Sequence, residues 1–177
     1  LHDALPISVE SDVSFGPRTE LILDSHNIPF SDRTFDAVIL QAVLEHVIDP
    51  FVCISEVERV LKDSGIVYVA TPFMQQVHMG RYDFTRFTYL GHRRLLRKFK
   101  EIDAGISAGP GVALAWSIKF FLRSLFKNKT LQIIMEILTG LLFFWLKYID
   151  YLTVNNNASY EAASSYYFIG RKHTGYH

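Results

Sequence analysis

The chain of 177 residues is long enough for one domain of ordinary size with a buried core. Hydrophobic residues make up 49% and charged residues 20%, a composition typical of a globular domain that excludes a disordered chain. Lysine plus arginine equals aspartate plus glutamate at 18 each, so the basic excess of nucleic-acid binders is missing and we expect no nucleic-acid partner.

The N-terminus does not look like the start of a natural coding sequence. Residues 1–7 read back as a nucleotide string that resembles the end of a common sequencing-library adapter, and the adapter's final base also fits the codon of Ser8. We therefore expect residues 1–7 to be an artefact and exclude them from the fold. On this interpretation residues 8–177 are a truncated domain, and the gene was cut upstream of Ser8.

The first half of the chain alternates between strand and helix patterns. Residues 21–23 and 35–40 are apolar runs bounded by turn residues, which predicts two buried strands. A helix with one apolar stripe is predicted over about 50–62, and a strand over 66–70. Strands and helices in this order predict an α/β fold, with a parallel sheet that carries helices on both faces.

The second half adds helices that are too long for a simple connection between strands. Helices are predicted over about 112–126 and 131–152, so residues 111–153 are interpreted as an inserted helical hairpin. The remaining predicted elements are a helix over 90–99, a strand that begins at Glu101 and a final strand over 165–170.

The hairpin is apolar but does not fit a membrane span. Residues 131–146 fall short of the ~20 residues that cross a bilayer, and Glu136 near the middle would cost about 2.5 kcal/mol or more. We therefore expect an amphipathic face against the domain, a protein partner or a membrane surface. Because Cys53 is the single cysteine and offers no disulfide, the predicted location is the cytoplasm, with membrane association through residues 112–152. The residues of the expected face are Leu131, Ile134, Leu138, Leu141, Trp145 and Ile149.

Several short motifs between residues 8 and 104 carry a family resemblance. In their order and spacing they resemble the class I S-adenosylmethionine (SAM) dependent methyltransferases of the type 11 kind, above all bacterial members encoded beside sugar and cell-envelope genes. The resemblance implies a Rossmann-like sheet, SAM as cofactor, and methyl transfer to an oxygen or nitrogen of a small-molecule, sugar-linked, glycan-linked or lipid-linked acceptor. The motifs are residues 24–30, 35–38, 43–47, 49–50 and 59–62, with Glu56 and Gly65 between and after them, and 167–172 resemble the closing strand.

The resemblance assigns the adenine end of the cofactor to Asp24 and Ser25. Asp24 ends the strand over 21–23, so its carboxylate is expected to accept a hydrogen bond from the adenine amino group. The alternative is a turn or helix cap, a position that aspartate favours in any protein. Ser25 is the next candidate, through its backbone N–H.

The rest of the cofactor is assigned to two further strand ends. Glu10 is expected to bind the ribose hydroxyls, with Asp12 as the rival and a solvated loop acid as the alternative. Gln41 and Ala42 follow the strand over 35–40, and their backbone groups are expected to line the methionine part.

The acceptor pocket is predicted in the segment over 71–88, where four chemically active side chains lie close in sequence. His78 is expected to take the acceptor's proton, with Asp83 orienting its imidazole. Arg86 and Tyr82 are expected to hold an anionic or sugar group. The alternative is an Asp83–Arg86 pair that only fixes a long loop.

Other polar residues receive no catalytic role from the sequence. His46 is expected to be structural, and Glu56 with Arg59 to be a surface ion pair of small energetic worth. No metal is predicted, because no cysteine and histidine ligand spacing is present.

The main departure from the family is the missing glycine-rich turn that holds the cofactor's methionine end. Gly16 is the only glycine before Gly65. We therefore expect the chain to lack its first strand and to be inactive as it stands. The alternative is a non-catalytic Rossmann-like binding or assembly subunit. An NAD-dependent oxidoreductase is disfavoured, since no strand is followed by a Gly-x-Gly-x-x-Gly turn.

Overall fold

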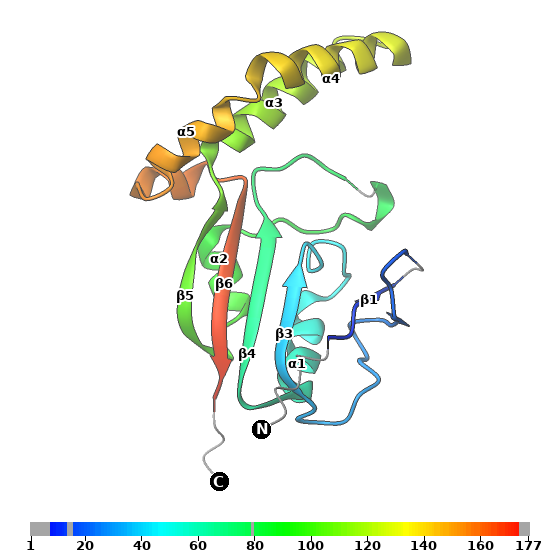
Figure 1. Ribbon diagram of the computed structural model, residues 1–177, viewed down its shortest axis with the longest axis vertical. Coiled ribbons are helices and arrows are strands. Elements are labelled where there is room, and N and C mark those ends of the chain that lie inside the picture. Colours follow the sequence, from blue (N-terminus) through cyan, green and yellow to red (C-terminus); the bar gives the residue numbers. More distant parts are fainter. Residues whose placement is uncertain (1–7, 14–15, 79, 174–177) are drawn as a thin grey trace, which may run out of the picture.

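The structure, a computed structural model, describes residues 8–13, 16–78 and 80–173 (Figure 1). Residues 1–7, interpreted above as adapter-derived, lie outside the described residues.

In the described part of the chain, six strands form two separate sheets. The short strands β1 (Ser11–Asp12) and β2 (Leu21–Ile22) pair with each other in parallel. The main sheet has the order β3–β4–β6–β5, with β3 parallel to β4 and β6 antiparallel to both of its neighbours. The predicted mixed α/β architecture is confirmed. Its strands are β3 (Phe35–Gln41), β4 (Leu61–Pro72), β5 (Phe99–Ala108) and β6 (Ser165–Lys172).

Two helices bury one face of the main sheet. Helices α1 (Pro50–Val60) and α2 (Tyr89–Leu95) lie behind the sheet in Figure 1. On β4, Val67 and Val69 are fully buried toward these helices, while the alternate residue Tyr68 is only half-buried. The expected helical cover is therefore present on one face in the described part of the chain. The core on that face includes Leu44, Ile54, Val57, Leu61, Leu96 and Phe168.

The first helix ends earlier than predicted, because tertiary pairing begins at its last residues. Leu61 pairs with Phe35 and so belongs to β4 rather than to the helix. Residues 63–65, between the predicted helix and the predicted strand, form an irregularity inside the strand pairing, where Ser64 has φ 63°. A Cβ at Gly65 would lie 2.9 Å from the Lys62 carbonyl oxygen, so only glycine fits there without a backbone shift.

β3 lies at an edge of the main sheet. No other described strand pairs with its outer side, and β1 and β2 form their own small sheet. The sequence predicted a strand buried on both faces, but Ile39 in its centre is 69% exposed. An exposed apolar edge strand is a site at which another strand can pair.

The inserted hairpin consists of three helices that project beyond one end of the sheet (Figure 1). They are α3 (Pro110–Ser124), α4 (Lys129–Phe143) and α5 (Leu146–Thr153). The prediction of one continuous helix over 131–152 is wrong, because the chain bends by 43° between α4 and α5. Among the described residues no one helix is long and apolar enough to cross a membrane, and only the bent α4–α5 pair reaches that length and composition.

Asp150 of α5 docks the start of α3. The N-cap residue Gly109 has no side chain to satisfy the first amides of α3. The Asp150 carboxylate accepts hydrogen bonds from the N–H groups of Gly109, Gly111 and Val112, at 3.2, 2.6 and 3.1 Å. A cap supplied from a distant helix thus fixes where α3 begins. Two 3-10 turns complete the fold, η1 (Gly80–Tyr82) and η2 (Asn157–Glu161).

Candidate functional site

The site lies at the carboxyl ends of the parallel strands β3 and β4. Beyond β3, Ala42 adopts φ 55°, a left-handed conformation that costs a non-glycine residue on the order of 1 kcal/mol. Its N–H donates to the Ala70 carbonyl of β4 at 3.0 Å, which keeps the two strand ends together. This turn directs the following residues, Glu45 and His46, across the end of the sheet.

The segment that follows β4 returns to the same point. The backbone carbonyl of Glu45 accepts hydrogen bonds from the N–H groups of Phe84 and Thr85, at 2.8 and 3.3 Å. Two segments about forty residues apart in sequence are thereby joined by backbone contacts. The segment over 71–88, predicted to form the acceptor pocket, therefore has a defined position beside Glu45.

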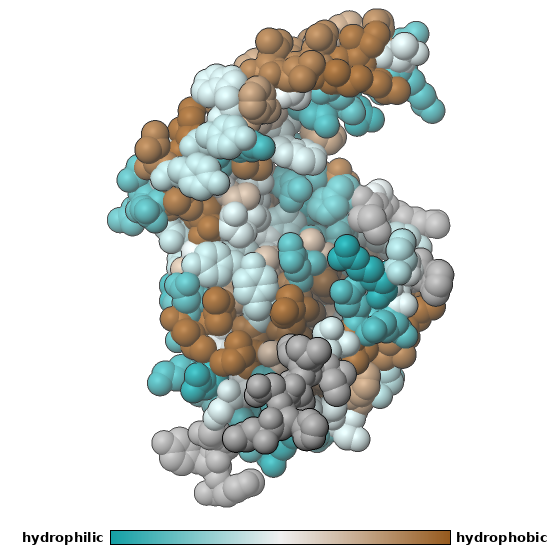
Figure 2. All heavy atoms as spheres, viewed as in Figure 1, coloured by the Kyte–Doolittle hydropathy of each residue, from teal (hydrophilic) through white to brown (hydrophobic). Residues whose placement is uncertain are grey.

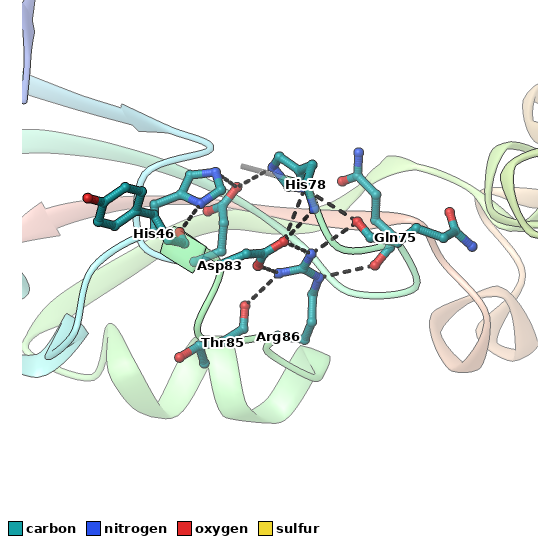
Figure 3. Close-up of polar contacts among 9 residues, drawn as sticks. His46, Gln75, His78, Asp83, Thr85 and Arg86 are labelled. Atoms are coloured by element: carbon teal, nitrogen blue, oxygen red, sulfur yellow. Dashed lines mark hydrogen bonds and ion pairs between the residues drawn. The ribbon is translucent and has the colours of Figure 1, made fainter. Parts of the chain in front are cut away.

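Asp83 and Arg86 form the buried ion pair that holds this segment (Figure 3). The side chain of Asp83 is 1% exposed, and the Arg86 guanidinium beside it lowers the carboxyl pKa to about 2. Arg86 also donates to the carbonyl oxygens of Gln75, Gln76 and Thr85, at 3.2, 3.2 and 3.0 Å.

The guanidinium of Arg86 is engaged with this loop, and the role predicted for it, holding an anionic or sugar group, stays a prediction. The structure places its Nε and both terminal nitrogens against atoms of the loop, so the guanidinium is committed to backbone and Asp83 contacts. This matches the alternative interpretation, in which the pair fixes a long loop. The sequence did not distinguish the two, because which carbonyl groups surround an arginine depends on how the loop folds back.

His78 lies on this fixed loop with its ring toward the site. Its backbone N–H donates to Asp83 Oδ2 at 2.7 Å. Its ring Nδ1 is 3.4 Å from the Gln76 carbonyl oxygen and 3.5 Å from Asp83 Oδ2. Asp83 therefore holds the backbone of His78 and lies near its ring, while the orienting role predicted for it stays a prediction.

His46, to which the sequence assigned no catalytic role, contacts His78 in the structure. The two rings meet edge to face with centroids 4.7 Å apart. The Nδ1 atom of His46 is 2.6 Å from the backbone carbonyl of Tyr82. Tyr82 thus serves the site through its backbone carbonyl, while the residue as a whole is half exposed. The signal that could have indicated His46 was its place directly beyond a strand end.

Glu45 lies beneath both histidines. Its side chain is fully buried, and burial raises the pKa of its carboxyl above the usual range. One of its oxygens, Oε1, is 3.8 Å from His46 Nε2 and 3.9 Å from His78 Nε2. These separations are too long for hydrogen bonds, and neither carboxylate oxygen has a hydrogen-bond partner among the described residues.

Asp24 and Ser25 are tied to the beginning of α1. Oδ1 of Asp24 accepts from the N–H of His26 at 2.9 Å and lies 2.6 Å from its Nδ1, while the other ring nitrogen of His26 accepts from the N–H of Asp49. The His26 N–H lowers the pKa of Asp24, so its carboxylate is ionised at neutral pH. Ser25 is buried, with its hydroxyl 3.3 Å from the Cys53 sulfur, which leaves its backbone N–H as the group for the predicted role.

The capping alternative for Asp24 is therefore present in the structure without excluding the adenine role. Its side chain is 68% exposed, and an ionised exposed carboxylate remains able to accept a further hydrogen bond. Glu10 and Gln41 are also exposed. The hydrogen bonds of Glu10 join it to Glu20 and Leu21 beside β1 and β2, so the structure shows no direct link between Glu10 and the histidine cluster.

Arg59 has a larger role than the surface pair expected from the sequence. It donates to the carbonyl oxygens of Ile28 and Phe30 at 2.8 and 2.7 Å, and to the carboxylates of Glu56 and Asp32. The turn after Asp24 is consequently fastened to α1 at several points, because one planar guanidinium reaches several acceptors.

Comparisons with known proteins agree with this fold. Residues 10–69 match the family model described as a methyltransferase domain. A search of curated proteins finds no match. Similar solved structures include the [4+2]-cyclase SpnF, at 17% identity and a TM-score of 0.51, over 89% of this chain and 57% of the cyclase.

Two further structures show the same likeness. A methyltransferase chain from the Haloferax volcanii complex with the Trm112 activator has 17% identity and a TM-score of 0.54, over 89% of this chain and 62% of the other. A protein of Bacillus halodurans C-125 described as a methyltransferase has 14% identity and a TM-score of 0.53, over 90% of this chain and 74% of the other. The chain therefore spans less than two thirds of the first two structures.

Residues 10–69 are thus similar to a methyltransferase domain, and the fold is similar to that of solved Rossmann-like methyltransferase structures. Such a domain implies SAM as the cofactor. Asp24 offers an ionised and exposed acceptor, which is the chemistry that the predicted adenine contact requires. Since one similar structure is a cyclase, the fold by itself does not fix the reaction.

Proposed function

We propose that this domain transfers a methyl group from SAM to an oxygen or nitrogen of a small-molecule, sugar-linked or cell-envelope-linked acceptor. The observation that carries the proposal is the pair His46 and His78 at the carboxyl ends of β3 and β4, the edge at which open parallel sheets bind their ligands. The family match over residues 10–69 supports the cofactor half of the proposal.

The residues of this chain orient the acceptor and take its proton. SAM supplies an electrophilic methyl carbon when it is bound. Nε2 of His78 would take the proton that the acceptor oxygen loses when it receives the methyl group. The Gln76 carbonyl and Asp83 face the other ring nitrogen of His78 and hold the ring in place. Alignment of the two reactants is the main contribution of the protein.

We further propose that the 177-residue chain needs an additional strand to bind SAM. The unpaired outer side of β3 and the separate β1–β2 sheet support this proposal, since a strand between them would join the two sheets. A glycine-rich turn on that strand would let the backbone approach the methionine end of the cofactor. Without it, the fragment is expected to be inactive and to associate through its open edge.

The test compares this chain with a longer one that carries the recovered upstream coding sequence, by equilibrium dialysis with labelled SAM. We expect only the longer chain to bind SAM. There, Asp24→Ala should weaken SAM binding about tenfold or more, because it removes a hydrogen bond to a charged group. His78→Ala should leave SAM affinity nearly unchanged and slow methyl transfer by roughly 10²–10⁴.

Asp36→Ala is the matched control, because Asp36 is an exposed carboxylate whose hydrogen bonds go to Lys62. A natural start codon at this point of the gene, with no glycine-rich strand upstream, would contradict the proposal. So would SAM binding that depends on His78 but not on Asp24. Either result would favour the alternative of a non-catalytic binding or assembly subunit.

We also propose that the hairpin docks on an anionic membrane surface. Its expected apolar face is exposed rather than packed on the domain, as the apolar cap over α4 and α5 in Figure 2 shows. Residues 110–153 carry five basic and two acidic residues, whereas the whole chain has no net charge. Both acidic side chains are engaged within the hairpin, Glu136 with Arg123 at 2.6 Å and Asp150 at the start of α3. An apolar face with surplus positive charge fits anionic lipid.

Sedimentation with vesicles tests the docking surface. We expect binding to vesicles rich in phosphatidylglycerol, weaker binding to phosphatidylcholine alone, and loss with added salt. Leu141→Glu should lower the partition constant about fivefold or more, since it places a charge on the exposed face. Leu90→Glu, at an exposed position of α2, is the control that should leave binding unchanged. Equal loss in both variants would refute the assignment to the hairpin.

A further inference from the structure

Glu45, His46 and His78 form a cluster with the chemistry of a metal site. Each offers one ligand atom, and these atoms all lie within 4.8 Å of one another. Both histidine Nε2 atoms face the same carboxylate oxygen of Glu45, at 3.8 and 3.9 Å. We infer that these three residues bind a divalent transition-metal ion of the zinc type. This inference goes beyond the proposed function and does not depend on it.

The buried carboxylate of Glu45 gives independent support. The side chain is fully buried, and neither of its oxygens has a hydrogen-bond partner in the described part of the chain. A buried carboxylate without a partner is unfavourable, so proteins normally pair such groups or use them to coordinate a metal. A cation between the three ligand atoms would supply the missing partner.

The remaining ring nitrogens are held as metal-binding histidines usually are. Nδ1 of His46 is 2.6 Å from the Tyr82 carbonyl oxygen, which can only accept, so Nδ1 carries the proton and Nε2 offers its lone pair toward Glu45. Nδ1 of His78 faces the Gln76 carbonyl oxygen at 3.4 Å and Asp83 at 3.5 Å, again acceptors. Figure 3 shows His46 and His78 converging from different segments.

The ligand set and spacing favour zinc over magnesium or calcium. Two imidazoles and one carboxylate suit zinc and its neighbours, whereas the harder cations prefer oxygen ligands only. Bonds of about 2.0–2.2 Å place tetrahedral ligand atoms roughly 3.4 Å apart, so the three ligand atoms, which lie within 4.8 Å of one another, would move closer together when the cation binds. Three protein ligands leave a position open for water or substrate, as in catalytic rather than structural zinc sites.

A bound cation would change how the acceptor loses its proton. It would occupy Nε2 of His78, the atom that accepts the proton in the proposed reaction. The acceptor hydroxyl would then coordinate the cation, which lowers the hydroxyl pKa, and its proton would pass to solvent. Metal and proton therefore compete for the same nitrogen.

Cobalt binding to the tag-free, metal-stripped 177-residue chain tests the site without cofactor or acceptor. We expect one equivalent of Co²⁺ to bind with visible absorption bands of a nitrogen and oxygen site, and Zn²⁺ to displace it. Glu45→Gln and His78→Ala should each weaken binding more than about tenfold. His173→Ala removes an exposed histidine outside the cluster and should leave the affinity unchanged.

Thermal unfolding separates loss of the site from loss of the fold. Zn²⁺ should raise the melting temperature of the unmodified chain, because it binds the folded state. Glu45→Gln removes the unpartnered buried charge, so the metal-free variant should melt no lower than the unmodified chain and lose the rise with Zn²⁺. The proposal is overturned if Co²⁺ does not bind at roughly tenfold excess, or if binding survives unchanged in both variants. Failure of SAM binding would leave this result untouched.

Discussion

Replacing Asp150 by alanine is expected to destabilise the packing of α3 on α5 by about 2–3 kcal/mol. The carboxylate accepts three backbone hydrogen bonds from Gly109, Gly111 and Val112, and no side chain of α3 itself can replace it. The loss of a helix cap costs about 0.5–2 kcal/mol, and hydrogen bonds to a charged group are each stronger than neutral ones. The negative charge also stabilises the positive end of the α3 dipole.

Hydrogen exchange of the first α3 amides, measured beside urea unfolding, checks this prediction. In Asp150→Ala the amides of Gly111 and Val112 should exchange faster by roughly the factor that corresponds to the lost stability. Asp150→Asn keeps an acceptor oxygen, so this variant should lose less stability than Asp150→Ala. Asp36→Ala, which removes an exposed carboxylate paired with Lys62, should change stability by less than about 1 kcal/mol. If Asp150→Ala and Asp36→Ala lowered the free energy of unfolding equally, the cap would stabilise the fold no more than an exposed ion pair does.

Acidification is expected to destabilise the fold by about 3 kcal/mol between pH 6.5 and 4 through His92 alone. This residue of α2 is 1% exposed between Phe87 and Phe168, and burial lowers its pKa from 6.5 to about 4. The folded state thus favours the neutral ring. Above pH 6.5 the ring is neutral in both states and its contribution is complete. As pH falls toward 4 the unfolded chain takes up the proton first, and stability is lost.

Comparison with His92→Leu isolates this effect from other titrating groups. Glu45 acts in the opposite direction, because burial raises its pKa and its protonated form is the one that folding favours. Glu45 is present in both proteins, so its titration cancels in the comparison, and the advantage of the leucine variant in unfolding free energy should grow as pH falls from 6.5 toward 4. At pH 7 the leucine variant should be at least as stable, since Nε2 of His92 has no hydrogen-bond partner among the described residues. A difference that does not change with pH would refute the prediction.

The sequence predicted the site in part. Residues 71–88 lie at the end of β4 and beyond it, and His78 and Asp83 lie together there, while their roles stay predictions. His46 and Glu45 were left out, although they directly follow β3. Their importance depends on the return of the later segment to the Glu45 carbonyl, a contact between residues about forty positions apart. Local patterns do not report such contacts.

The sequence by itself determined the α/β class and most element positions, because apolar periodicity and turn residues act over a few neighbours. It also indicated the turn at Asp24, where an acid follows an apolar run. The tertiary structure decided how residues distant in the chain are combined. It ended α1 at Val60 because Leu61 pairs with Phe35, and bent the predicted long helix so that Asp150 reaches the start of α3. It also placed Glu45, fully buried, beneath two histidines from separate segments. Each of these depends on long-range pairing and burial, which no local pattern encodes.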